Sequence, residues 1–90
     1  LFISLDHIGI VVANLEESIK LYTETLGFKL IERERLKDSY TELVFLESAG
    51  TVIELLYSHA TDSSQSTVKR FLEKRGPGLH HLCYKVENIE

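Results

Sequence analysis

Cysteine is almost missing from this sequence: Cys83 is the single cysteine among 90 residues. One cysteine excludes an internal disulfide framework and is typical of a reducing compartment. Long apolar runs are also missing, since no stretch approaches the roughly 20 residues that a membrane helix needs. A basic excess is missing too, because the formal net charge is −4. We therefore expect a cytoplasmic protein whose partners include no nucleic acid and no membrane.

The remaining composition is that of an ordinary globular domain, with 43% hydrophobic and 27% charged residues. A chain of this length supports one small core. It opens on Leu1 and stops within a recurring pattern, so we expect that neither end is a natural terminus.

Periodicity and turn residues predict a β-α-β-β-β order followed by a linker helix and one more strand. Asn14 with Glu17 three residues later is a capping pair, and Gly27 is a helix terminator. The run 59–67 is polar and indicates a linker. The predicted strands span 5–12, 28–35, 39–48, 51–58 and 79–86, with helices over 14–26 and 68–75.

A repeat links the two ends of the chain. When residues 5–16 (LDHIGIVVANLE) are laid over residues 79–90 (LHHLCYKVENIE) without gaps, Leu, His, Val, Asn and Glu coincide at five of twelve positions. The offset is 81 − 7 = 74 residues, longer than the repeats of solenoid proteins. We infer a duplicated module: 1–58 form the first copy, 59–78 a linker with a helix, and 79–90 the first strand and helix start of a truncated second copy.

The repeat separates two neighbouring histidines. His81 falls on His7, whereas His80 falls on Asp6. Because adjacent strand residues point to opposite faces, we expect His7 and His81 to converge on one point and His80 to face a helix or solvent. The alternative is that both histidines are incidental strand residues, which is the common case for a single histidine.

Two glutamates interrupt apolar strand sequences. Glu54 lies in TVIELLY and Glu42 in YTELVFL, each with apolar neighbours at positions two residues away. Since an unpaired buried carboxylate is costly, an apolar pocket would need a cation beside Glu54. Two imidazoles and a carboxylate suit a borderline divalent ion. The alternative is an edge strand whose acids are solvated.

The segments LDHIGIVVANLEESIKLYTETLGFKLIER, TVIELLYS and FLEKRGPGLHHLCYKVENIE resemble the vicinal oxygen chelate (glyoxalase/bleomycin resistance/dioxygenase) superfamily. The resemblance implies an α+β fold in which βαβββ modules form a cupped mixed sheet with helices on its outer face. It also implies that His7, Glu54 and His81 are metal ligands for one divalent ion, among Co, Ni, Zn and Mn. A fourth ligand and a second acid/base group are then expected beyond residue 90.

Within that superfamily the chain is more similar to methylmalonyl-CoA epimerase than to lactoylglutathione lyase (glyoxalase I). The resemblance implies a homodimer that abstracts a proton next to a thioester carbonyl of a small-molecule substrate through a metal-stabilised enolate. We take Glu42 as the candidate base, expecting it on the face that carries Glu54; a structural or solvent-facing acid is the alternative. A lyase acting on the methylglyoxal–glutathione hemithioacetal and a metal-free binding protein of the same fold remain the competing functions.

Overall fold

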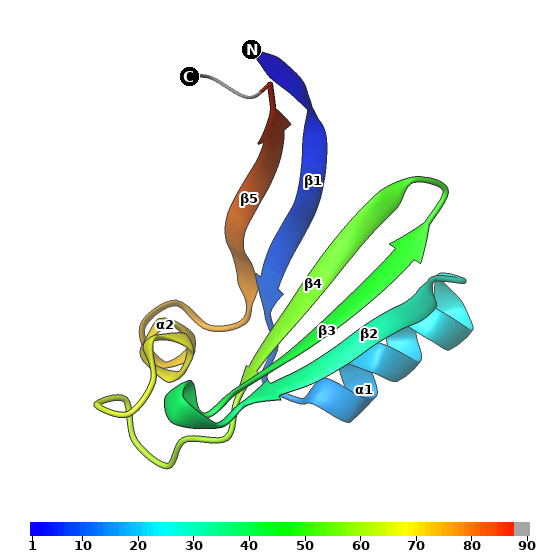
Figure 1. Cartoon of the computed structure of the whole chain (residues 1–90). Helices are drawn as coiled ribbons and strands as arrows, with labels where there is room; N and C mark the ends of the chain where they lie inside the picture. Colours follow the sequence, from blue (N-terminus) through cyan, green and yellow to red (C-terminus); the bar gives the residue numbers. More distant parts are fainter. Residues whose placement is uncertain (88–90) are drawn as a thin grey trace.

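The computed structural model describes residues 1–87 and contains one five-stranded mixed sheet with two helices (Figure 1). The strand order is β2-β3-β4-β1-β5, in which β1 and β4 are parallel and the other neighbours antiparallel. The elements are β1 (Phe2–Val11), α1 (Leu15–Lys20), the π-helix η1 (Leu21–Thr25), β2 (Lys29–Leu36), the 3-10 helix η2 (Lys37–Ser39), β3 (Thr41–Ser48), β4 (Thr51–Ser58), α2 (Thr67–Arg75) and β5 (Gly78–Val86).

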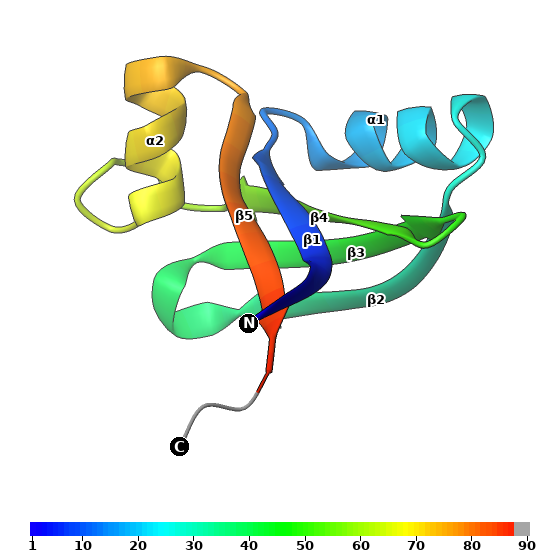
Figure 2. The same cartoon turned by 90° about the horizontal axis from the view of Figure 1, so that it is seen from above.

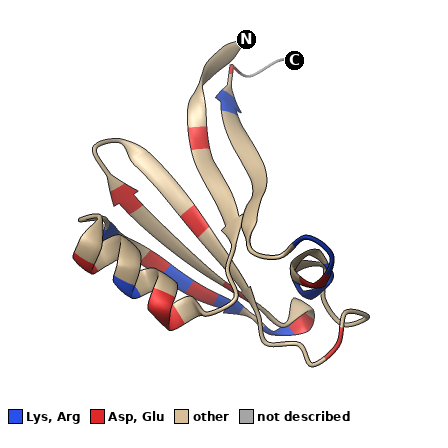
Figure 3. Cartoon of the chain, turned by 180° about the vertical axis from the view of Figure 1, so that it is seen from behind, with Lys and Arg blue, Asp and Glu red and all other residues tan. Residues whose placement is uncertain are grey.

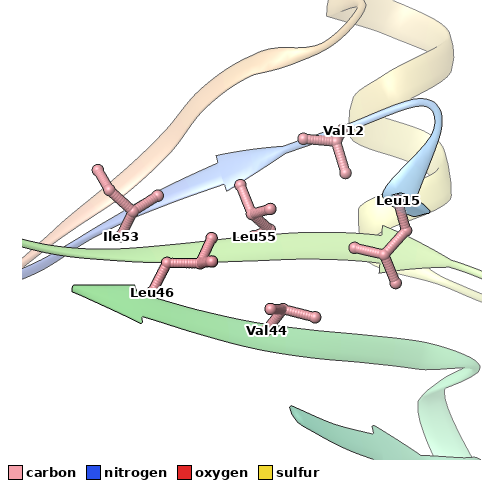
Figure 4. Packing of buried hydrophobic residues seen from close by; sticks show 6 residues of the cluster. All are labelled: Val12, Leu15, Val44, Leu46, Ile53 and Leu55. Atoms are coloured by element: carbon pink, nitrogen blue, oxygen red, sulfur yellow. The ribbon is translucent and has the colours of Figure 1, made fainter. Parts of the chain in front are cut away.

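Helix α1 covers one face of the sheet and forms the larger core there. Its first turn is capped as predicted, because the side chain of Asn14 accepts a hydrogen bond of 3.1 Å from the Glu17 N–H. Leu15 then packs against apolar side chains of β3 and β4 (Figure 4). The buried members of this core are Val12, Leu15, Val44, Leu46, Ile53 and Leu55.

Helix α2 packs near the start of β5, apart from α1 (Figure 2). Its Val68 forms a second cluster with Val11 and Leu56, joined by Phe71 and Leu72 of the same helix. Leu56 alternates with the core residue Leu55, so it lies on the face opposite α1. The two helices therefore do not share one face, whereas both were expected on the outer face.

The predicted elements are found within a few residues, apart from the second half of the first helix. The first helix becomes π-helical after Lys20, and the Leu26 N–H donates to the Leu21 carbonyl. Strand β1 is buried only in its second half, because β4 pairs with it from Ile8 onward and the preceding residues pair with β5 alone.

Charged residues are distributed unevenly over these elements. Basic segments gather on α2, and acidic and basic segments alternate along β2 (Figure 3). Within residues 1–87, no helix has the length and apolar character that crossing a membrane demands. The predicted helix start at 88–90 lies outside the described residues, so the division into modules stays a prediction.

Candidate metal centre

One row of paired positions crosses the sheet on the face opposite α1. Glu54 pairs with Phe45 on one side and with Gly9 on the other, and Gly9 in turn pairs with His81. His7 lies two residues before Gly9 on β1 and therefore points to the same face. Strand pairing thus brings three side chains together from β1, β4 and β5.

The three predicted ligands meet in this row. The Oε1 atom of Glu54 lies 3.3 Å from Nε2 of His7 and 3.0 Å from Nε2 of His81. The two Nε2 atoms are 3.4 Å apart. Glu54 is buried with 7% of its surface exposed, and both histidines are partly buried. Burial of the Glu54 carboxylate, which would be unfavourable without a partner, is therefore compensated by two neighbouring imidazoles.

These separations fit a divalent ion. Metal–nitrogen and metal–oxygen bonds of about 2.1 Å place neighbouring ligand atoms about 3.4 Å apart in a tetrahedron and about 3.0 Å apart in an octahedron. The observed 3.0, 3.3 and 3.4 Å cover that range. Two imidazole nitrogens and a carboxylate are also the donor types that Zn²⁺, Co²⁺ and Ni²⁺ accept. The residues present therefore fit a metal.

The orientation of His7 is set by its other ring nitrogen. Nδ1 of His7 lies 2.8 Å from Oδ2 of Asp6, and the ring edge of His7 contacts Phe45 with centroids 5.5 Å apart. A carboxylate that accepts the Nδ1 proton leaves Nε2 as the lone-pair nitrogen facing Glu54. Asp6 is thus a positioning residue that sequence reasoning did not identify.

Gly9 is a second residue that sequence reasoning missed. A Cβ atom at this position would lie 2.2 Å from Cε1 of His81 and 2.5 Å from both of its ring nitrogens. The imidazole of His81 therefore lies directly over the Gly9 backbone. A glycine inside a strand pattern often marks such a close approach, and that signal was present in LDHIGIVV.

His80 points toward α2, where its ring centroid is 5.0 Å from that of Phe71. Burial lowers the pKa of His80, as does the neighbouring His81. Its Nδ1 also lies 2.7 Å from Nδ1 of His81, a distance at which one nitrogen donates and the other accepts. The irregular register of β5 next to Gly9 allows this contact between adjacent residues. His80 therefore contacts the ring of His81 and does not itself belong to the group formed by His7, Glu54 and His81.

The predicted placement of Glu42 is wrong. Glu42 pairs with Tyr57, and Glu54 pairs with Phe45, so the two carboxylates point to opposite faces. The hairpin turn determines which strand residues pair and so which face each glutamate takes. Ala49 and Gly50 both have positive φ angles, which makes a two-residue turn and pairs Ser48 with Thr51. Counting outward from that turn pairs Glu42 with Tyr57, which packs against the α1 core.

On the α1 face, Glu42 belongs to a separate ionic network. It is 9% exposed and accepts hydrogen bonds from Arg33 Nε and, at 2.8 Å, from Nε2 of His59. Arg33 also donates to Glu16 of α1 at 2.5 Å. Burial raises the pKa of the Glu42 carboxyl group, but the hydrogen bonds from Arg33 and His59 outweigh it and hold that pKa below its ordinary value. Glu42 therefore lies on the wrong face of the sheet to act as a base beside His7, Glu54 and His81.

Comparison with known proteins agrees with the fold. A sequence profile of the Glyoxalase/Bleomycin resistance protein/Dioxygenase superfamily matches residues 6–90. The ethylmalonyl-CoA/methylmalonyl-CoA epimerase of Cereibacter sphaeroides is 35% identical over 94% of this chain and 62% of its own length. The lactoylglutathione lyase of Schizosaccharomyces pombe is 32% identical over 96% of this chain and 33% of its own length.

Solved structures show the same architecture. The crystal structure of methylmalonyl-CoA epimerase from Mycobacterium tuberculosis superposes with a TM-score of 0.83 at 34% identity, covering 99% of this chain and 59% of that one. The predicted fold class, a mixed sheet of the vicinal oxygen chelate type, is thereby confirmed. The chain spans about half the length of the curated relatives it matches.

Proposed function

This chain belongs to the Glyoxalase/Bleomycin resistance protein/Dioxygenase superfamily, and from that premise we propose that it carries half of an active site that epimerises a methylmalonyl-CoA-like thioester. The observation that carries the proposal is the convergence of His7, Glu54 and His81 within 3.4 Å of one another on one sheet face. The similarity to epimerases named for methylmalonyl-CoA supports the substrate class.

Such a reaction removes the proton from C2 of the acyl group and returns a proton to the opposite side of that carbon. A bound divalent ion supplies Lewis-acid stabilisation for the negative charge that then develops on the thioester oxygen. His7 and His81 would each offer an imidazole nitrogen to that ion, and the Glu54 carboxylate would compensate part of its charge. Asp6 fixes the tautomer of His7 through Nδ1.

The proposal places the remaining groups outside the first module. A fourth ligand and the acid/base groups come from a second module, which begins with β5 and continues past residue 90. Support comes from the repeat between residues 5–16 and 79–90 and from the greater length of the relatives. The exposed apolar side chains of β1 and β5 offer a surface for such a module or for a second subunit of a homodimer: Phe2, Ile3, Leu5, Leu82, Tyr84 and Val86.

Hydrogen exchange catalysed by the metal-loaded full-length protein tests the proposed reaction. In deuterium oxide, an epimerase exchanges the C2 proton of methylmalonyl-CoA for deuterium, which proton NMR follows directly. We expect this exchange to be lost in His81→Ala and to be retained in the neighbouring variant His80→Ala.

The competing lyase function predicts a different product, a thioester formed from methylglyoxal and glutathione. The similarity to a lactoylglutathione lyase makes this the second candidate. Thioester formation without C2 exchange would replace the epimerase by the lyase. A full-length protein without stoichiometric metal and without either activity would favour the metal-free binding protein instead. We further propose a cytoplasmic location, in keeping with the single cysteine.

A further inference from the structure

A second group of metal-ligating side chains lies beside the first. Asp6, His7 and Cys83 each offer one ligand atom, and these atoms all lie within 4.8 Å of one another. Cys83 is the direct partner of His7 in the β1–β5 register, so the two side chains share a face of the sheet. Its thiol is free and partly buried. The mechanism proposed above makes no use of this thiol.

A local irregularity of β1 brings Asp6 into the group. Leu5 pairs with Tyr84 and His7 with Cys83, so two steps along β1 match one step along β5 and Asp6 is the extra residue. In a regular strand Asp6 and His7 would point to opposite faces. The bulge redirects the carboxylate, and Oδ2 of Asp6 lies 2.8 Å from Nδ1 of His7.

The carboxylates of the two groups face opposite nitrogens of the His7 imidazole. Nε2 of His7 faces Glu54 at 3.3 Å, while Nδ1 faces Asp6. The first group offers nitrogen and oxygen donors only. The second adds a sulfur donor, which favours thiophilic borderline ions such as Zn²⁺, Co²⁺ and Cd²⁺ over Mg²⁺ or Ca²⁺.

We propose that Asp6, Nδ1 of His7 and Cys83 form a second position for a thiophilic divalent ion, joined to the first position by the imidazole of His7. Two dications carry four positive charges. The carboxylates of Glu54 and Asp6, the Cys83 thiolate and a His7 imidazolate carry four negative charges, so these side chains neutralise the two ions. The thiol proton and the Nδ1 proton pass to solvent when the second ion binds. The side chain of Asp6 is 54% exposed, which leaves a path for the ion from solvent.

Cobalt binding to the full-length protein tests this second position, because a cysteine thiolate bound to Co²⁺ adds a charge-transfer band in the near ultraviolet. We expect the wild type to show this band at saturating Co²⁺ and to bind one more Co²⁺ per chain than Cys83→Ser. Asp6→Asn should weaken the Co²⁺ affinity measured from the band by about tenfold or more. If the wild type shows no band that depends on Cys83, or if Asp6→Asn leaves that affinity unchanged, the assignment is overturned.

The variant Glu54→Gln separates the second position from the first. It weakens the first group and should retain the charge-transfer band, so failure of the proposed reaction and failure of the second position are distinguishable. Loss of the band in Glu54→Gln would place Cys83 on the first ion and refute a separate position. A measurement without substitutions guards against misfolded variants: Zn²⁺ should slow alkylation of Cys83, followed by mass spectrometry of its peptide. Equal alkylation rates with and without Zn²⁺ would also refute the proposal.

Discussion

An alanine at position 9 would test the placement of His81 with a single methyl group. The new Cβ atom would lie 2.2 Å from Cε1 of His81, whereas ordinary contact begins at 3.4 Å. The ring must therefore move by 3.4 − 2.2 = 1.2 Å. Gly9 does not have a positive φ angle, so the backbone accepts alanine without strain. The methyl group thus acts on the imidazole rather than on the strand.

That displacement is large for a metal ligand and small for the fold. Metal–ligand bonds tolerate deviations of about 0.2 Å, so a ring moved by more than 1 Å no longer binds. Loss of an outer partner of a ligand already costs about 10–100-fold in metal affinity, so we expect Gly9→Ala to weaken binding by at least about 100-fold, or about 2.8 kcal/mol. The free energy of unfolding without metal should change by less than about 1 kcal/mol, since the clash involves the end of a side chain.

A double-mutant cycle identifies the cause of the loss. Zn²⁺ affinity is measured by competition with a chromophoric chelator in the wild type, in Gly9→Ala, in His81→Ala and in the double variant. Without the imidazole the clash disappears, so Gly9→Ala should have little further effect in the His81→Ala background. An unchanged affinity in Gly9→Ala, or the same loss in both backgrounds, would refute the placement of His81 over Gly9.

Three further predictions concern the two adjacent histidines, Glu42 and the α1 cap. His81→Ala should lower Zn²⁺ affinity by at least about 100-fold and His80→Ala by only about tenfold, because the first removes a ligand and the second removes an outer partner of that ligand; equal losses would contradict the proposed repeat alignment. Glu42→Gln should lower the free energy of unfolding by about 1.5 kcal/mol near pH 7. Because the pKa of Glu42 is lowered in the folded protein, this difference is present above the ordinary carboxyl pKa and is lost as pH falls through the folded value; a difference in urea unfolding that does not shrink as pH is lowered below the ordinary carboxyl pKa would exclude this linkage. Asn14→Ala should cost about 1 kcal/mol through loss of the α1 cap, measured in the same way, and Asn14→Ser should restore most of it.

Patterns in the sequence were sufficient to single out the three predicted ligands. The offset of 74 residues related His7 to His81, and their Nε2 atoms do lie 3.4 Å apart. Glu54 stood out because a carboxylate in an apolar strand needs a partner, and the structure supplies two imidazoles. These inferences depend on residue type, on alternation along a strand and on an internal repeat, and none of the three requires knowledge of the pairing between strands.

The side of the sheet that each strand presents was decided by tertiary structure. Alternation places Glu42 with Val44 on one face of β3, but the pairing across the Ala49–Gly50 turn determines that this is the α1 face. A bulge likewise turned Asp6 toward Nδ1 of His7, and close strand pairing placed the His81 ring over Gly9. Each of these outcomes depends on the register between strands, which is a property of contacts between segments and is not contained in the sequence of one segment.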